Sequence, residues 1–243
     1  MSRLAALTRA AAAHRLTVSG IVSVMPGDGL PPRIRSVVLL SPDEPAFWPH
    51  VTAQPEFGDG APGPLDRWSR RVIGALACDL GGKAWFPFGG PPWRPFTAWA
   101  LRSGQAFTSP VGLLVHATRG LFISWRGAIG LEEALAPTFT RTLAPALADS
   151  SAPALADTPA PALADTPAQR PCDTCAAPCM AACPVDAFAG GRYDVAACHA
   201  YLDTGPGADC LTGGCRVRRA CPVGAGNRQA AQSAFHMKAF HPR

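Results

Sequence analysis

The sequence predicts an α+β fold that a spacer divides into two domains. Over residues 1–143, segments with helical spacing of apolar residues alternate with short segments rich in Val and Ile. An Ala/Pro-rich repeat then occupies 144–167, and eight of the nine cysteines lie beyond it. We therefore predict a mixed-sheet domain at 1–143, a linker at 144–169 and a small cysteine-rich domain at 170–243.

The elements of the first domain follow from local patterns. Helices are expected where apolar residues recur every three or four positions, at 4–14, 64–80 and 96–103. The second of these begins at Pro64 and ends before Gly81 and Gly82, which suits a helix start and stop. Short apolar runs bounded by Pro or Gly predict strands at 16–24, 34–40, 83–86, 111–116 and 121–125, the last two joined by a turn.

The repeat consists of three eight-residue units, APALADSS, APALADTP and APALADTP. Units this short cannot form a solenoid, whose repeats have about 20 residues or more. The prolines block both helix and sheet hydrogen bonding. We therefore expect an extended, semi-stiff spacer.

The composition narrows the class of protein. Hydrophobic residues make up 48% and charged residues 16%, as in an ordinary chain with a packed core. No apolar run reaches the roughly 18 residues of a membrane helix, so no membrane partner is expected. The net charge of +5 favours an acidic redox partner or an anionic cofactor. Nucleic acid is not expected, because no basic run is interleaved with aromatic residues.

Residues 1–15 are Ala-rich and contain scattered arginines. We favour a surface helix here over a mitochondrial presequence, which would also be rich in Arg and poor in acids. Without an export signal, a cytoplasmic and reducing location is expected. Dense cysteines in such a compartment bind metal or carry redox chemistry instead of forming disulfides.

Eight cysteines lie in two runs, and each run ends in Cys-Pro. The first run is Cys172-x2-Cys175-x3-Cys179-x3-Cys183-Pro184. The second run begins at Cys198 and continues as Cys210-x4-Cys215-x5-Cys221-Pro222. Close cysteines that end in Cys-Pro are typical of proteins with two [4Fe-4S] clusters.

The spacing also predicts which cysteines share a cluster. A tight loop can present three thiolates to one cubane, but the departing chain cannot easily supply the fourth, so the cysteine before Pro goes to the other cubane. One cluster is then expected to be bound by Cys172, Cys175, Cys179 and Cys221. The other is expected to be bound by Cys183, Cys198, Cys210 and Cys215. All eight cysteines are used in this scheme.

Structural zinc is the alternative for these cysteines. Zinc sites usually contain pairs of C-x2-4-C separated by a spacer, so iron–sulfur clusters are favoured. Arg216, Arg218 and Arg219 lie beside the ligands expected for the second cluster. They either raise its reduction potential or form a solvated face, and the sequence leaves both interpretations open. The ninth cysteine, Cys78, is expected to be a small buried hydrophobe.

The cysteine-rich region resembles the C-terminal domain of epoxyqueuosine reductases and, more distantly, of reductive dehalogenases. In those families a C-x2-C-x2-C-x3-C-P run is followed by a cysteine that opens a helix, which CHAYLDT at 198–204 matches. Upstream, GLLVHATRGLFISWRGAIGL at 112–131 resembles both the reductases and the cobalamin-processing chaperones of the methylmalonic aciduria and homocystinuria type. The order of the two regions is similar to that of small bacterial two-[4Fe-4S] ferredoxin-like proteins.

The resemblance implies a nitroreductase-like domain that holds a corrinoid, followed by a ferredoxin-like two-cluster domain. Arg126 and His116 match the Arg and the His of the chaperone segment, which makes them the implied cofactor-binding residues. A surface Arg and a structural His are the alternatives. The proton-donating acid of the reductases has no counterpart in FGGPPW at 88–93, so epoxide reduction on tRNA is not implied.

The expected function is electron transfer through two [4Fe-4S] clusters, from a redox donor protein to a corrinoid in the N-terminal domain. A cobalamin-dependent or cobalamin-processing reductase would fit this interpretation, and a flavin is the nearest substitute for the corrinoid. The alternative is a simple ferredoxin-type carrier whose N-terminal domain only docks partners. The sequence assigns no catalytic residue and names no small-molecule substrate.

Overall fold

We describe the protein from a computed structural model, in which residues 2–135, 139–140, 163–164 and 168–242 are described. The chain forms two compact units. The sheet unit comprises Met1–Ser41, Pro62–Gln105 and Trp125–Ala168. The cysteine unit comprises Pro42–Ala61, Ala106–Ser124 and Gln169–Arg243. Two stretches that precede the predicted linker, 42–61 and 106–124, thus belong to the cysteine unit.

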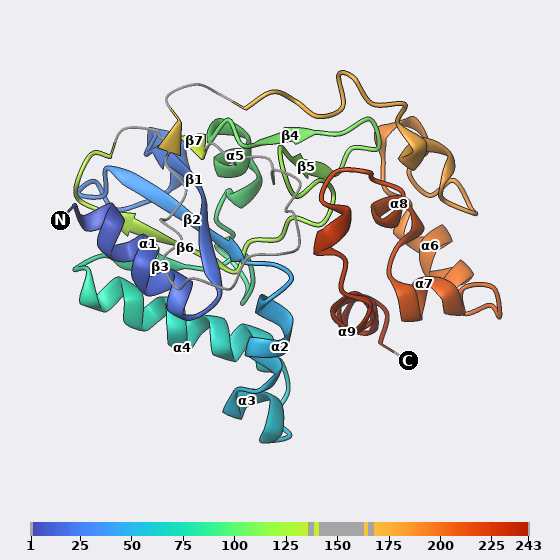
Figure 1. Cartoon of the computed structure of the whole chain (residues 1–243), viewed down its shortest axis with the longest axis horizontal. Helices are drawn as coiled ribbons and strands as arrows, with labels where there is room; N and C mark the ends of the chain where they lie inside the picture. The colour runs from blue at the N-terminus through green and yellow to red at the C-terminus, as the bar shows by residue number, and fades with distance from the viewer. Residues whose placement is uncertain (1, 136–138, 141–162, 165–167, 243) are drawn as a thin grey trace, which may run out of the picture. The chain divides into compact units, whose positions relative to one another are not determined.

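A four-stranded sheet with the strand order β1–β2–β6–β3 forms the centre of the sheet unit (Figure 1). The strands are β1 (Leu16–Ser23), β2 (Ser36–Pro42), β3 (Lys83–Trp85) and β6 (Gly127–Leu131). β6 runs antiparallel to β2 and β3. Every residue of β2 and β6 is buried, so these central strands are covered on both faces. A Cβ on Gly130 would lie 2.1 Å from Cζ3 of Trp85, so this close packing requires glycine there.

Helices cover the sheet because each presents an apolar face to it. They are α1 (Arg3–Ala13), α4 (Pro64–Asp79) and α5 (Phe96–Arg102). In α4 the buried residues Leu65, Trp68, Val72 and Leu76 recur at helical spacing. Cys78 lies off this face and is exposed, so the prediction that it is buried is wrong.

A charged contact fixes the short 3₁₀ turn η1 (Pro26–Asp28) to α5. Nη1 and Nη2 of Arg102 donate hydrogen bonds to the two carboxylate oxygens of Asp28, at 2.9 and 2.8 Å. The backbone N–H of Met25 donates to the same carboxylate at 2.8 Å. The Asp28 side chain is only 3% exposed, so this contact is largely shielded from water.

The cysteine unit consists of short helices, 3₁₀ turns and a two-stranded sheet. Its strands β4 (Ala106–Thr108) and β5 (Leu114–His116) pair antiparallel. Its helices are α2 (Phe47–Thr52), α3 (Pro55–Gly58), α6 (Val195–Leu202), α7 (Ala208–Gly213), α8 (Arg216–Arg219) and α9 (Ala230–Phe240). Its 3₁₀ turns are η2 (Pro178–Ala181), η3 (Ala189–Gly191) and η4 (Ala225–Asn227).

A small hydrophobic core joins distant parts of the cysteine unit. Val115 and Leu121, which precede the repeat, pack with Cys179, Val217 and Cys221, which follow it. The longest helix of the unit, α9, packs against α7. The segment 106–124 is therefore part of the structure that positions the cysteines.

The strand predicted at 121–125 is not formed, and this stretch is irregular. β5 pairs with β4 instead, and only an isolated bridge joins His116 to Gly120. The carbonyl oxygen of Leu121 accepts a hydrogen bond from Nη1 of Arg218 at 2.6 Å. The carbonyl group that a strand would use to pair with its neighbour is thus hydrogen-bonded to a side chain 97 residues away. Local pattern could not predict that partner.

The α+β class is confirmed, with a small antiparallel sheet. Most of the repeat at 144–167 lies outside the described residues, so the extended spacer stays a prediction. Within it, β8 (Leu163–Ala164) pairs antiparallel with β7 (Phe139–Thr140). In the part of the chain that the structure describes, no helix combines the length and the apolar character needed to cross a bilayer.

Candidate metal centres

Two groups of four thiols line two cavities in the cysteine unit. The first thiol group borders the smaller cavity and consists of Cys172, Cys175, Cys179 and Cys221. The second thiol group borders a cavity of about 360 Å³ and consists of Cys183, Cys198, Cys210 and Cys215. The structure thus brings together the same residues that the spacing assigns to each cluster. None of these cysteines forms a disulfide.

Irregular backbone around a 3₁₀ turn presents the first thiol group. Cys179 lies in η2, which follows Ala177 in the left-handed conformation, with φ of 50°. The N–H of Ala177 donates a hydrogen bond to Sγ of Cys175 at 3.3 Å. Cys221 follows α8 and is buried in the same hydrophobic core as Cys179.

Gly120 forms part of the wall behind Cys221. Its φ is +57°, in the left-handed region that favours glycine. A Cβ at this position would lie 2.8 Å from Sγ of Cys221 and 2.2 Å from the carbonyl oxygen of Val223. The turn between His116 and Gly120 can therefore approach the cysteine only without a side chain.

Three short helices and a turn present the second thiol group. Sγ of Cys183 accepts a hydrogen bond from the N–H of Ala187 at 3.3 Å. Cys198 lies in α6. Asp194 caps the N-terminus of this helix, and its Oδ1 accepts a hydrogen bond from the N–H of Ala197 at 2.9 Å. Cys210 lies in α7, and Cys215 directly precedes α8.

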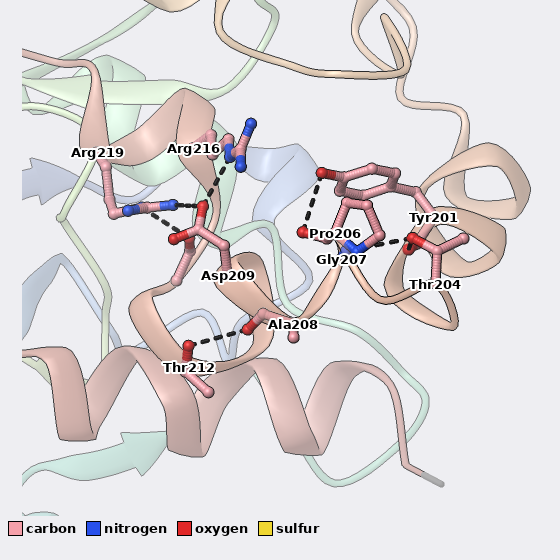
Figure 2. Close-up of polar contacts among 10 residues, drawn as sticks. Tyr201, Thr204, Pro206, Gly207, Ala208, Asp209, Thr212, Arg216 and Arg219 are labelled. Carbon is pink, nitrogen blue, oxygen red and sulfur yellow. Dashed lines mark hydrogen bonds and ion pairs between the residues drawn. The ribbon is translucent and has the colours of Figure 1, made fainter.

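Hydrogen bonds within the chain close the long interval between Cys198 and Cys210 (Figure 2). Oη of Tyr201 donates to the carbonyl oxygen of Pro206 at 3.1 Å. Oγ1 of Thr204 donates to the carbonyl oxygen of Tyr201 at 2.7 Å and accepts from the N–H of Gly207 at 3.2 Å. This compact turn lets two cysteines far apart in the sequence border one cavity.

The thiols of a group act on one another electrostatically. Burial raises the pKa of Cys179, and Cys221, Cys172 and Cys175 raise it further. In the second group, burial likewise raises the pKa of Cys198, and its three partner thiols add to the effect. Metal binding removes these protons, because the ligand is the thiolate.

The donor set of each thiol group is compatible with a [4Fe-4S] cluster. Four thiols are the ligands that such a cluster takes. Among the described residues, no three His, Cys, Asp or Glu side chains converge closely enough to hold a single metal ion. In a cubane each thiolate bonds to a different iron atom, so four thiolates that surround a space are compatible with it.

Asp209, next to Cys210, holds two of the three arginines of α8 (Figure 2). Its Oδ2 accepts a hydrogen bond from Nε of Arg216 at 2.7 Å and another from Nη2 of Arg219. Nε of Arg219 also donates to the carbonyl oxygen of Gly214 at 3.0 Å. The hydrogen bonds from Arg216 and Arg219 lower the pKa of Asp209 and keep it ionised. The carboxylate therefore offsets part of their positive charge.

Arg218 lies on the same helix but makes different contacts. It lines the larger cavity, where it interacts electrostatically with Cys215 and Tyr193. Its Nη1 donates a hydrogen bond to the carbonyl oxygen of Leu121 at 2.6 Å. Burial lowers the pKa of Arg218, and no carboxylate among the described residues offsets its charge.

The two residues that the resemblance assigns to a cofactor pocket belong to different units. In the sheet unit, Nη2 of the buried Arg126 donates to Oδ1 of Asp66 at 2.6 Å, and its Nε donates to Oγ of Ser69 at 3.1 Å. Burial lowers the pKa of Arg126, and Asp66 raises it. In the cysteine unit, Nδ1 of the buried His116 accepts from the N–H of Thr118 at 3.2 Å. Each side chain thus has partners inside its own unit.

No protein family, curated protein or solved structure matches this chain. The two thiol groups and the charges around them are therefore the features of the chain that point to a function.

Sequence patterns did not point to several residues at the larger cavity. Glu44 lines it, and burial raises the pKa of this carboxyl while a hydrogen bond from Gln232 lowers it. Glu44 precedes Pro45 in an irregular stretch, far from any cysteine in the sequence. Tyr193 forms a hydrogen bond to Cys198, and its nearness to the cysteine runs was the only signal for it.

Proposed function

We propose that this chain is an iron–sulfur electron-transfer protein that binds two [4Fe-4S] clusters. The observation that carries the proposal is the grouping of the eight cysteines, in which each of two cavities is lined by four thiols. The cysteines before Pro, Cys183 and Cys221, each join the group formed mainly by the other run. Two-cluster ferredoxins exchange the same ligand.

Each cluster, when bound, takes up and releases one electron, which a redox donor protein supplies. The chain contributes ligands, burial and hydrogen bonds. The N–H groups of Ala177 and Ala187 point at Cys175 and Cys183, one in each thiol group, and such bonds stabilise charge on sulfur. Cys179 and Cys210 are buried, and the hydrophobic core around Cys179 and Cys221 limits the access of water to the first thiol group.

Metal analysis of anaerobically prepared protein tests the proposal. We expect about eight iron and eight acid-labile sulfide per chain, because two cubanes contain that many. Cys78→Ala is the matched control, since Cys78 is exposed and belongs to neither thiol group, and it should leave both contents unchanged. Stoichiometric zinc without sulfide would show that the groups are structural zinc sites instead.

In this proposal the cysteine unit is a ferredoxin-like module, and the sheet unit forms most of the nitroreductase-like domain implied by the resemblance at 112–131. Residues 112–124 of that resembling segment belong to the cysteine unit. A corrinoid as the terminal acceptor is supported by that resemblance alone. Titration with cob(II)alamin, followed by EPR, should then give a base-off signal. Because Arg126 is bonded to Asp66, a change at Arg126 is informative only if the melting temperature is measured alongside binding. No binding would favour the simple carrier.

A further inference from the structure

The three arginines of α8 differ in how their charge is offset. Asp209 bonds to both Arg216 and Arg219, whose side chains are 41% and 32% exposed. Arg218 lines the cavity of the second thiol group. Its charge interacts with Cys215 more strongly than with Tyr193. The sequence leaves open whether these arginines form a solvated face or have an electrostatic role. The contacts favour a solvated face for Arg216 and Arg219 and an electrostatic role for Arg218.

The Arg218 side chain is half-buried in this cavity. A half-buried guanidinium without a carboxylate is unfavourable unless another negative charge offsets it. A cubane core with four thiolates carries net negative charge, which increases by one on reduction. A fixed cation beside such a group therefore favours the reduced state and raises the reduction potential. The hydrogen bond between Tyr193 and Cys198 acts in the same direction, because it stabilises charge on sulfur.

The first thiol group lacks an equivalent charge among the described residues that line its cavity. Arg170 acts on Cys172, but its side chain is 41% exposed and pairs with Asp173 at 3.3 Å. Arg228 donates to the carbonyl oxygen of Cys221 at 2.9 Å and is exposed. Solvent screens both charges, and each thiol group has a similar N–H donor. Arg218 is therefore the main difference in positive charge between the two sites.

We propose that Arg218 holds the reduction potential of the second cluster above that of the first. When the two clusters together hold one electron, that electron then resides mainly on the second cluster, at the larger cavity. This inference rests on the proposed two-cluster function. In this proposal Arg218 binds no iron and acts on the second cluster only through its positive charge.

Potentiometric EPR titration of the unmodified protein gives the first test. Cys172→Ser and Cys183→Ser assign the two signals to the first and second cluster. The second cluster should have the higher midpoint potential. An equal or lower potential would overturn the inference, whatever the behaviour of any Arg218 variant. Failure to find two clusters by iron and sulfide analysis would instead contradict the proposed function.

Charge variants give the second test. Arg218→Gln should lower the midpoint of the second cluster by at least about 59 mV, a tenfold change in the reduced-to-oxidised ratio for one electron, and leave the first unchanged. Arg218→Lys should restore most of that shift, because it retains the charge. Arg219→Gln is the matched control, because Arg219 lies on the same helix but is bonded to Asp209. It should shift both midpoint potentials by much less than Arg218→Gln shifts that of the second cluster. Equal shifts at both clusters, or no shift with Arg218→Gln, would refute the assignment.

Discussion

Among single residues, Gly120 is a sensitive position because its backbone is left-handed and lies against Cys221. Alanine there would adopt an unfavourable left-handed conformation and place its Cβ 2.8 Å from Sγ of Cys221. We expect Gly120→Ala to displace Cys221, to reduce the iron content to about half, and to lower the free energy of unfolding by at least about 1 kcal/mol. Iron and sulfide analysis with EPR would measure the loss.

The matched control for that change is Gly226→Ala in the same unit. A Cβ on Gly226 meets nothing within 4 Å, so this variant should keep its full iron content. If Gly120→Ala also retained both clusters, the contact between the turn at Gly120 and Cys221 would not hold the ligand in place.

The cysteines could be assigned from the sequence because their chemistry depends on spacing within short runs. Arg218 could not be distinguished from Arg216 and Arg219, since its environment depends on Leu121, which is distant in the sequence. Glu44 could not be found for the same reason, because its partner Gln232 lies in the last helix.

At the scale of elements, the contact between Asp28 and Arg102 joins η1 to α5. Burial alone would raise the pKa of Asp28, but the hydrogen bonds from Arg102 and Met25 outweigh it, and the net shift is downward. A carboxyl whose pKa is lowered by folding stabilises the fold at pH values above its unfolded-state pKa, which is about 3.9. That contribution is lost as the pH falls through the folded-state pKa.

We expect Asp28→Asn to lower the free energy of unfolding by about 2 kcal/mol at pH 7, because it leaves Arg102 without its carboxylate. The difference between the two proteins in urea midpoint, followed by far-UV circular dichroism, should shrink as the pH falls toward 4 and below. Asp79→Asn, at an exposed position in α4, should have little effect. A difference that is independent of pH would contradict the ionic role of Asp28.

Helices and strands were predictable where their pattern is local. α1, α4, α5, β1 and β3 lie within one or two residues of the predicted ranges. β4 was not predicted from the sequence. The stretch at 121–125 has the apolar character of a strand, but a side chain occupies the carbonyl oxygen of Leu121.

At the scale of the whole molecule, the division into units does not follow the order of the sequence. The stretches 42–61 and 106–124 fold with the cysteine-rich region. Long-range packing decides this, as in the core that joins Val115 and Leu121 to Cys179 and Cys221. Composition and repeats could place a linker but could not reveal such packing.

EPR of the reduced cysteine variants shows whether Cys221 shares a cluster with the first run of cysteines. Cys221→Ser should remove or alter the same cluster signal as Cys179→Ser, because both thiols border the smaller cavity. Cys215→Ser should affect the other signal, because Cys215 borders the larger one. The grouping would be contradicted if Cys221→Ser and Cys215→Ser altered one cluster signal and Cys179→Ser altered the other.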